Sequence, residues 1–196
     1  MRRLFYVTHG DVEMDPATPV PDWGLSVRGR ARHEAFAARL GPVAAVFCSE
    51  ERKARDGAEI LCRGRGLVPK AVQALHENDR SATGYLPPEE FERVADAFFA
   101  RPEESVRGWE RAVDAQGRVV GALRQIAEEV PGGDVAVVAH GGVGALFRAH
   151  LLGSGIDRSH DQPQGRGGGH VIEVALPDWT LLRDWTALED WPEMAE

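Results

Sequence analysis

The chain has 196 residues, a hydrophobic content of 43% and a formal net charge of −8 at pH 7. A chain of this size can bury a substantial core as one domain, and its hydrophobic content is that of a globular protein. The acidic balance argues against a broad nucleic-acid-binding surface, and no apolar stretch is long enough to cross a membrane. The two cysteines indicate ordinary reduced thiols, and Met1–Arg3 leads directly into a predicted strand without a signal peptide, so we expect a cytoplasmic protein.

Strand and helix patterns alternate along the first half of the chain. The apolar run at residues 4–7 predicts a strand, and a proline-rich loop follows it. Ser26 is the expected N-cap of the first helix, because its side chain can accept a backbone N–H of the first turn. The elements expected next are a helix over 26–40, a strand over 43–49, a helix over 50–62, a short strand or extended segment over 68–75, and a polar loop over 76–84.

The second half continues the alternation with longer helical patterns. The expected elements are helices over 87–100 and 105–130, a strand over 135–140, a helix over 143–152, a loop over 153–169, and a hairpin of strands over 170–176 and 180–185. This order predicts one α/β domain over residues 1–196, a three-layer sandwich in which helices cover both faces of a mostly parallel central sheet. Residues 76–131 are expected to form a helical cap insertion over the sheet edge.

Two apolar runs of strand length each end in His-Gly. The first ends at His9-Gly10 and the second at His140-Gly141. Ligands collect outside the carboxyl ends of parallel strands, so we expect both imidazoles at the same edge of one sheet. One histidine after a buried strand is more often structural than catalytic. Two of them, each followed by a glycine that lets a ligand come close, predict a site for phosphoryl or proton chemistry.

With these residues the chain resembles the histidine phosphatase superfamily, in its phosphoglycerate mutase-like branch. That family begins with a strand ending in Arg-His-Gly and places Ser-x-x-x-Arg-Ala after its second strand. An acidic residue in a mid-chain loop and a late strand ending in His-Gly complete its pattern. The matching positions here are Thr8-His9-Gly10, Ser49 to Ala54, Glu77 and His140-Gly141. The resemblance implies a phosphoglycerate mutase-like sandwich and a cofactor-independent phosphomonoesterase.

Two positions depart from the family pattern among the residues that would hold phosphate. Thr8 stands in place of the first phosphate-binding arginine, and Lys53 in place of the second, with Arg52 beside it. Arginine grips a phosphate through a planar fork, whereas lysine is a point charge and threonine offers only a hydroxyl. One lost charged hydrogen bond costs about 1.5–3 kcal/mol, or about ten- to hundredfold in affinity or rate. Arg80 in the central loop is the candidate replacement, and Thr8→Arg should raise activity unless Arg80 already fills that space.

The resemblance also implies a role for each residue. His9 would attack phosphorus and carry the phosphoryl group, and His140 would donate to a phosphoryl oxygen as charge develops. Glu77 would protonate the leaving alkoxide and then activate water, with Asp79 in the same loop as an alternative. The residues expected to bind substrate are Thr8, Gly10, Arg52, Lys53, Arg80 and Gly141.

The expected partner is a small phosphorylated molecule, with no cofactor, no nucleic acid and no membrane. The aromatic residues Phe98, Phe99 and Trp109 would suit a lid or a homodimer contact. His160, Asp161 and His170 offer metal-ligand types, but the irregular loop between them does not favour a metal site.

Plainer interpretations of the same residues stay open. Arg52, Lys53 and Arg55 could form a solvated helix face paired with the acidic residues around them, and Glu77–Asp79 could be a self-capping turn. The alternative function is a catalytically weak or inactive family member that binds an anionic ligand as a sensor or partner protein. Thr8 is the residue that favours this alternative.

Overall fold

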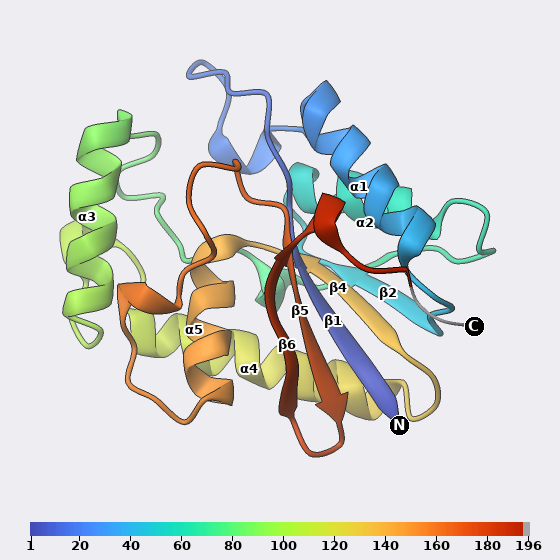
Figure 1. The fold of residues 1–196 in the computed structure, drawn as a ribbon. Coiled ribbons are helices and arrows are strands. Elements are labelled where there is room, and N and C mark those ends of the chain that lie inside the picture. The colour runs from blue at the N-terminus through green and yellow to red at the C-terminus, as the bar shows by residue number, and fades with distance from the viewer. Residues whose placement is uncertain (194–196) are drawn as a thin grey trace.

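The computed structural model describes residues 1–193. A six-stranded sheet runs through the centre of this part of the chain, in the order β3-β2-β4-β1-β5-β6 (Figure 1). The strands are β1 (Arg2–Thr8), β2 (Ala45–Cys48), β3 (Lys70–Ala71), β4 (Val135–Ala139), β5 (His170–Leu176) and β6 (Thr180–Ala187). Neighbours from β3 to β1 are parallel, while β5 is antiparallel to both β1 and β6. The mostly parallel sheet expected from the sequence is confirmed.

Helices cover both faces of this sheet. The helices are α1 (Val27–Arg39), α2 (Arg52–Cys62), α3 (Pro88–Ala100), α4 (Ala112–Glu129) and α5 (Gly141–Leu151). The α1 and α2 helices lie on one face and α4 and α5 on the other, which gives the predicted three layers (Figure 1). Nowhere in residues 1–193 is a helix both long and apolar enough to cross a membrane.

The central strands are buried on both sides, and this explains their continuous apolar sequence. Along β1, Leu4 and Tyr6 join the core cluster that contains α4 and α5 side chains. Phe5 and Val7 join the second cluster, with α1 and α2 side chains. Side chains alternate between the faces of a strand, so a strand covered on both faces needs apolar residues at every position.

The structure corrects the expected helix over 105–130. A short 3-10 turn occupies Val106–Gly108, and α4 begins only at Ala112. Arg107 has a φ of 53° and Gly108 a φ of 82°, and this left-handed backbone cannot continue a right-handed helix. The strand or extended segment expected over 68–75 shrinks to the two residues of β3, followed by a 3-10 turn over Gln73–Leu75. The helix expected from 143 begins earlier, at Gly141.

Residues 76–131 separate into two parts. The α4 helix packs in the same core cluster as β1 and β4, so it belongs to the layer that covers the sheet. The α3 helix stands at the side of the sheet (Figure 1). Phe98, Phe99 and Trp109 are buried in this core, so they pack inside the domain and are not presented at its surface for the lid or homodimer contact expected of them. The role of residues 76–131 as a cap stays a prediction.

Candidate active site

His9 and His140 meet at the carboxyl edge of the sheet, as predicted. Strands β1 and β4 are parallel neighbours whose last residues, Thr8 and Ala139, are paired. The next residue of each strand is a histidine, and the His9 backbone N–H donates to the Ala139 carbonyl at 3.0 Å. The two imidazole centroids lie 5.3 Å apart with the rings inclined by 67°. Parallel pairing in register therefore brings together two residues that are far apart in the sequence.

The His9 ring is held in one tautomer. Its Nδ1 lies 2.9 Å from the carbonyl oxygen of Gly10, so Nδ1 carries the proton and Nε2 keeps a lone pair. Burial, together with His140 and Lys53, lowers the pKa of His9 to about 3, so the imidazole is neutral near neutral pH. The Gly10 N–H donates to His33 Nε2 at 3.1 Å. The Gly10 carbonyl therefore orients the His9 ring, and the Gly10 N–H is held by His33; the role of Gly10 in binding substrate stays a prediction.

His140 is fully buried and held by three polar contacts. Its Nε2 lies 2.7 Å from Ser49 Oγ and 3.3 Å from Glu51 Oε1, and its carbonyl oxygen accepts from the Tyr6 hydroxyl at 2.8 Å. Burial lowers the pKa of His140, although Glu51 and Glu77 oppose that shift. Within residues 1–193 its Nδ1 has no hydrogen-bond partner. A neutral imidazole with one committed and one free nitrogen can give or take a proton at the free one.

Glu51 is a residue of this cluster that the sequence analysis did not single out. Its carboxylate contacts Lys53 Nζ at 2.5 Å and accepts from the Glu77 backbone N–H at 3.0 Å, besides facing His140. Burial alone would raise the pKa of Glu51, but His140 and Lys53 outweigh it and lower the pKa below its usual range. Glu51 is the N-cap residue of α2 and has extended backbone, so its side chain turns to the sheet edge instead of following the helix face. No spacing rule marks such a residue.

Lys53 and Arg52 have different surroundings although they are adjacent. Lys53 is buried, and its ammonium donates to the Val20 carbonyl at 2.9 Å as well as to Glu51. Arg52 is exposed, and its guanidinium lies 3.5 Å from the Asp22 carbonyl. Of these two residues expected to bind substrate, the structure brings Lys53 into the histidine cluster and turns Arg52 toward the loop before α1.

Glu77 caps the N-terminus of α5. Its carboxylate accepts from the N–H groups of Gly142 at 3.0 Å and Val143 at 2.9 Å, and it pairs with Arg80 at 3.0 Å. Burial would raise the pKa of Glu77, but Arg80, His140 and the N–H donors together lower it. The helix dipole stabilises an anion at this position. The alternative acid, Asp79, is exposed and accepts from its neighbour Ser81 at 2.8 Å.

Arg80 lies beside this carboxylate but not beside Thr8. Its guanidinium sits over the rings of Phe91, 5.0 Å from the centroid, and Trp109, 5.3 Å from the centroid. Thr8 is fully buried, and its hydroxyl contacts Gln162 Oε1 at 2.7 Å. The space next to Thr8 is therefore occupied by Gln162, which no sequence pattern indicated because it lies in an irregular loop.

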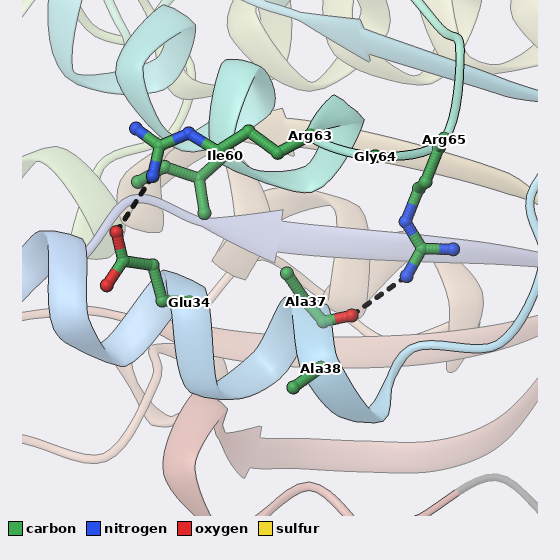
Figure 2. A pocket seen from close by; sticks show the side chains of 7 residues that line it. All are labelled: Glu34, Ala37, Ala38, Ile60, Arg63, Gly64 and Arg65. Carbon is green, nitrogen blue, oxygen red and sulfur yellow. Dashed lines mark hydrogen bonds and ion pairs between the residues drawn. The ribbon is translucent and has the colours of Figure 1, made fainter.

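Two other observations bear on where ligands could lie. A shallow pocket away from the histidines lies between α1 and α2, crossed by an ion pair of Glu34 and Arg63 at 2.8 Å (Figure 2). Its lining residues are Glu34, Ala37, Ala38, Ile60, Arg63, Gly64 and Arg65, and none of them is a site candidate.

In the part of the chain that the structure describes, no three His, Cys, Asp or Glu side chains gather as a metal site.

Comparison with solved structures finds the same fold in several proteins. A mycobacterial glucosyl-3-phosphoglycerate phosphatase, in complex with inorganic phosphate, is 24% identical with a TM-score of 0.77, covering 96% of this chain and 99% of that one. Bacillus stearothermophilus YhfR is 22% identical with a TM-score of 0.80, covering 98% of this chain and 99% of that one. The alpha-ribazole phosphatase from Shigella flexneri is 18% identical with a TM-score of 0.71, covering 99% of each chain.

The family comparison covers nearly the whole chain. A search of curated proteins gave no match. The model of the histidine phosphatase superfamily (branch 1) matches residues 4–185, a span that includes both histidines and every expected site residue. The chain belongs to branch 1 of the histidine phosphatase superfamily.

Proposed function

We propose that this protein hydrolyses phosphomonoesters of small molecules through a phosphohistidine on His9. The observation that carries the proposal is the state of the His9 imidazole, whose Nδ1 is held by the Gly10 carbonyl at 2.9 Å and whose pKa is lowered to about 3. A neutral imidazole with a free Nε2 lone pair is a nucleophile at neutral pH. Two of the similar structures are named as phosphatases of phosphorylated small molecules, which supports the same class of substrate here.

The reaction balances with the residues of this site. His9 Nε2 forms a bond to phosphorus while the ester P–O bond breaks, and the leaving alkoxide takes a proton from Glu77. Water then attacks the phosphohistidine, gives its proton back to Glu77, and releases phosphate and neutral His9. His140 stabilises the charge that develops on the phosphoryl oxygens, as does the positive end of α5, which begins at Gly141.

Lys53 and Arg80 are the cations proposed to face the phosphoryl group. Both act on the histidines electrostatically, since Lys53 lowers the pKa of His9 and both cations lower that of His140. A buried lysine close to the nucleophile attracts a phosphoryl dianion more strongly than an exposed one, because water screens it less.

The proton donor has to be un-ionised when the ester bond breaks. The pKa of Glu77 is lowered in the free protein, but a phosphoryl dianion bound beside it would raise that pKa again, because like charges disfavour ionisation. Asp161 is another carboxyl group near Glu77, and burial raises its pKa despite opposing contacts with the Gln162 N–H and Arg158. We propose Glu77 as the donor because its loop matches the family pattern.

The direct experiment is hydrolysis of p-nitrophenyl phosphate from pH 4 to pH 9, with His9→Ala as the control. The proposal expects turnover by the wild-type protein and none by the variant, at an unchanged unfolding midpoint. Equal activity of the two proteins would overturn it.

A second candidate function is that of a family member that binds an anion without turnover. It is favoured by the ionised Glu51, which already contacts His140 and Lys53. Phosphate binding by calorimetry in the absence of any His9-dependent hydrolysis would select this candidate. The cytoplasmic location and a homodimer stay predictions.

A further inference from the structure

The buried hydroxyl of Thr8 has a defined direction. The backbone N–H of His170 donates to Thr8 Oγ1 at 2.8 Å, so the hydroxyl proton is left for an acceptor. Its closest acceptor is Gln162 Oε1 at 2.7 Å, and a longer contact reaches the His170 carbonyl at 3.4 Å. The His170 Nδ1 lies 3.1 Å from the same Gln162 oxygen. The hydroxyl of Thr8 donates to this atom, which makes it the oxygen end of the Gln162 amide.

The nitrogen end of that amide lies next to Gly141, the residue that follows His140. A Cβ added at Gly141 would come within 2.4 Å of Gln162 Nε2, so the amide sits directly above the start of α5. A Cβ added at Gly168 would lie 3.7 Å from the same nitrogen and 2.5 Å from the His9 carbonyl oxygen, which places the amide beside the His9 backbone as well. No acceptor in residues 1–193 bonds Gln162 Nε2, and the side chain is half-buried.

We infer that Gln162 Nε2 donates the hydrogen bond to the bound phosphoryl group that an arginine at position 8 would donate in the family pattern. The Thr8 side chain is short and buried. Its hydroxyl instead contacts the Gln162 amide, whose longer side chain carries the donor. Thr8 and His170 are positioning residues in this arrangement, and Gln162 is the binding residue. The inference rests on the proposed function, because it assigns a donor to the phosphoryl group of that reaction.

A near-isosteric substitution separates the donor from the rest of the side chain. Gln162→Glu keeps an oxygen for Thr8 and His170 but replaces the donor by a second carboxylate oxygen. We expect the affinity for inorganic phosphate and for vanadate, measured by calorimetry, to fall about ten- to hundredfold, and the KM for p-nitrophenyl phosphate to rise in parallel. Gln164→Glu, at an exposed position in the same loop, controls for the net charge, and Gln162→Met, which removes the donor without adding a charge, should lose phosphate affinity as well.

The relation between Thr8 and Gln162 has its own test. Because the Gln162 amide fills the space beside Thr8, we now expect Thr8→Arg alone to lower activity. In the double variant Thr8→Arg with Gln162→Ala, the guanidinium takes the vacated place and phosphate affinity should return to the wild-type value or above. Thr8→Val, which lacks the hydroxyl, should weaken phosphate binding. Thr8→Ser, which keeps the hydroxyl, should bind phosphate as the wild-type protein does. If the side chain served the fold alone, the double variant would be worse than either single variant.

The outcomes for the proposed function and for this inference are distinguishable. If the wild-type protein shows neither His9-dependent turnover nor phosphate binding, both fall. If the wild-type protein is active and His9→Ala is not, but Gln162→Glu binds phosphate as Gln164→Glu does, the inference is wrong and the proposed function stands. A phosphate affinity lost in Gln162→Glu and regained in the double variant supports the inference.

Discussion

Replacing Glu51 by glutamine should strengthen phosphate binding. The Glu51 carboxylate contacts Lys53 Nζ at 2.5 Å and lies 3.3 Å from His140 Nε2, and these are two of the groups proposed to hold a phosphoryl dianion. Lys53 and His140 lower the pKa of Glu51, so the carboxylate is ionised at neutral pH and repels the dianion. The glutamine has the same shape and keeps an oxygen for Lys53, but it carries no charge.

Elementary electrostatics sets the size of the effect. Two unit charges about 4 Å apart interact with about 4 kcal/mol at an effective dielectric constant of about 20. A phosphoryl oxygen held by Lys53 would lie at about this distance from Glu51, because both would contact the same ammonium group. Rearrangement of the two anions and screening by water reduce this repulsion to about a third. The remaining repulsion corresponds to about tenfold in phosphate affinity. Glu51→Gln should therefore lower the phosphate Kd about tenfold.

The assay is calorimetric titration with inorganic phosphate at pH 7, backed by vanadate inhibition of p-nitrophenyl phosphate hydrolysis. Glu50→Gln is the matched control, because Glu50 is the exposed neighbour and removes the same charge from the same segment. An equal gain in both variants would assign the effect to net charge alone. Unchanged or weaker binding by Glu51→Gln would refute the reasoning, since the carboxylate would then not compete with the anion.

Three further predictions address stability and proton transfer. Gly57→Ala should lower the free energy of unfolding in urea by about 1–3 kcal/mol, because the added Cβ would lie 2.7 Å from His33 Cε1. Gly117→Ala is the control: its added Cβ meets open space in α4, so it should raise the free energy of unfolding by about 0.5–1 kcal/mol. Burial, with the charge of Arg32, lowers the pKa of His33 to about 3 from 6.5, so the unfolded chain binds more protons between these pH values. The free energy of unfolding should therefore fall as the pH drops from 6.5 toward 3, and it should fall less steeply in His33→Gln. If denaturation from pH 7 to pH 4 gives the same pH dependence for both proteins, this prediction is wrong. Glu77→Gln should slow the release of the alcohol from an alkyl phosphate in the first turnover about 10²–10⁴-fold, and the first-turnover burst of p-nitrophenol far less, because a good leaving group needs no proton. If Asp161→Asn shows that pattern and Glu77→Gln does not, the donor is Asp161.

The sequence was sufficient for the fold because its central strands are buried on both faces. Continuous apolar runs at residues 4–7 and 135–139 left few alternatives to a covered parallel sheet, and the histidine after each run had to reach the same edge. The break before α4 was not predictable from periodicity. Apolar side chains at Val106 and Trp109 continue the helical spacing, but the left-handed backbone at Arg107 interrupts the helix.

The composition of the site was less predictable than its location. Glu51 looks like one acidic residue among several at the start of a helix, and only its N-cap backbone turns it inward. Gln162 lies in an irregular loop, and its side chain contacts Thr8 and His170 at the point where β5 begins beside the end of β1. Side chains placed by loops and caps have no periodicity, so tertiary contacts decide where they point.

The central claim is that His9 carries the phosphoryl group, and a trapping experiment tests it most directly. The protein is mixed with an excess of a phosphomonoester, quenched in alkali within the first turnover and digested, and the peptides are analysed by mass spectrometry. We predict one phosphoryl group on His9, stable in alkali and released by acid, and no phosphorylated peptide from His9→Ala. Active hydrolysis with no phosphorylated peptide, or with the phosphoryl group on another residue, would contradict it.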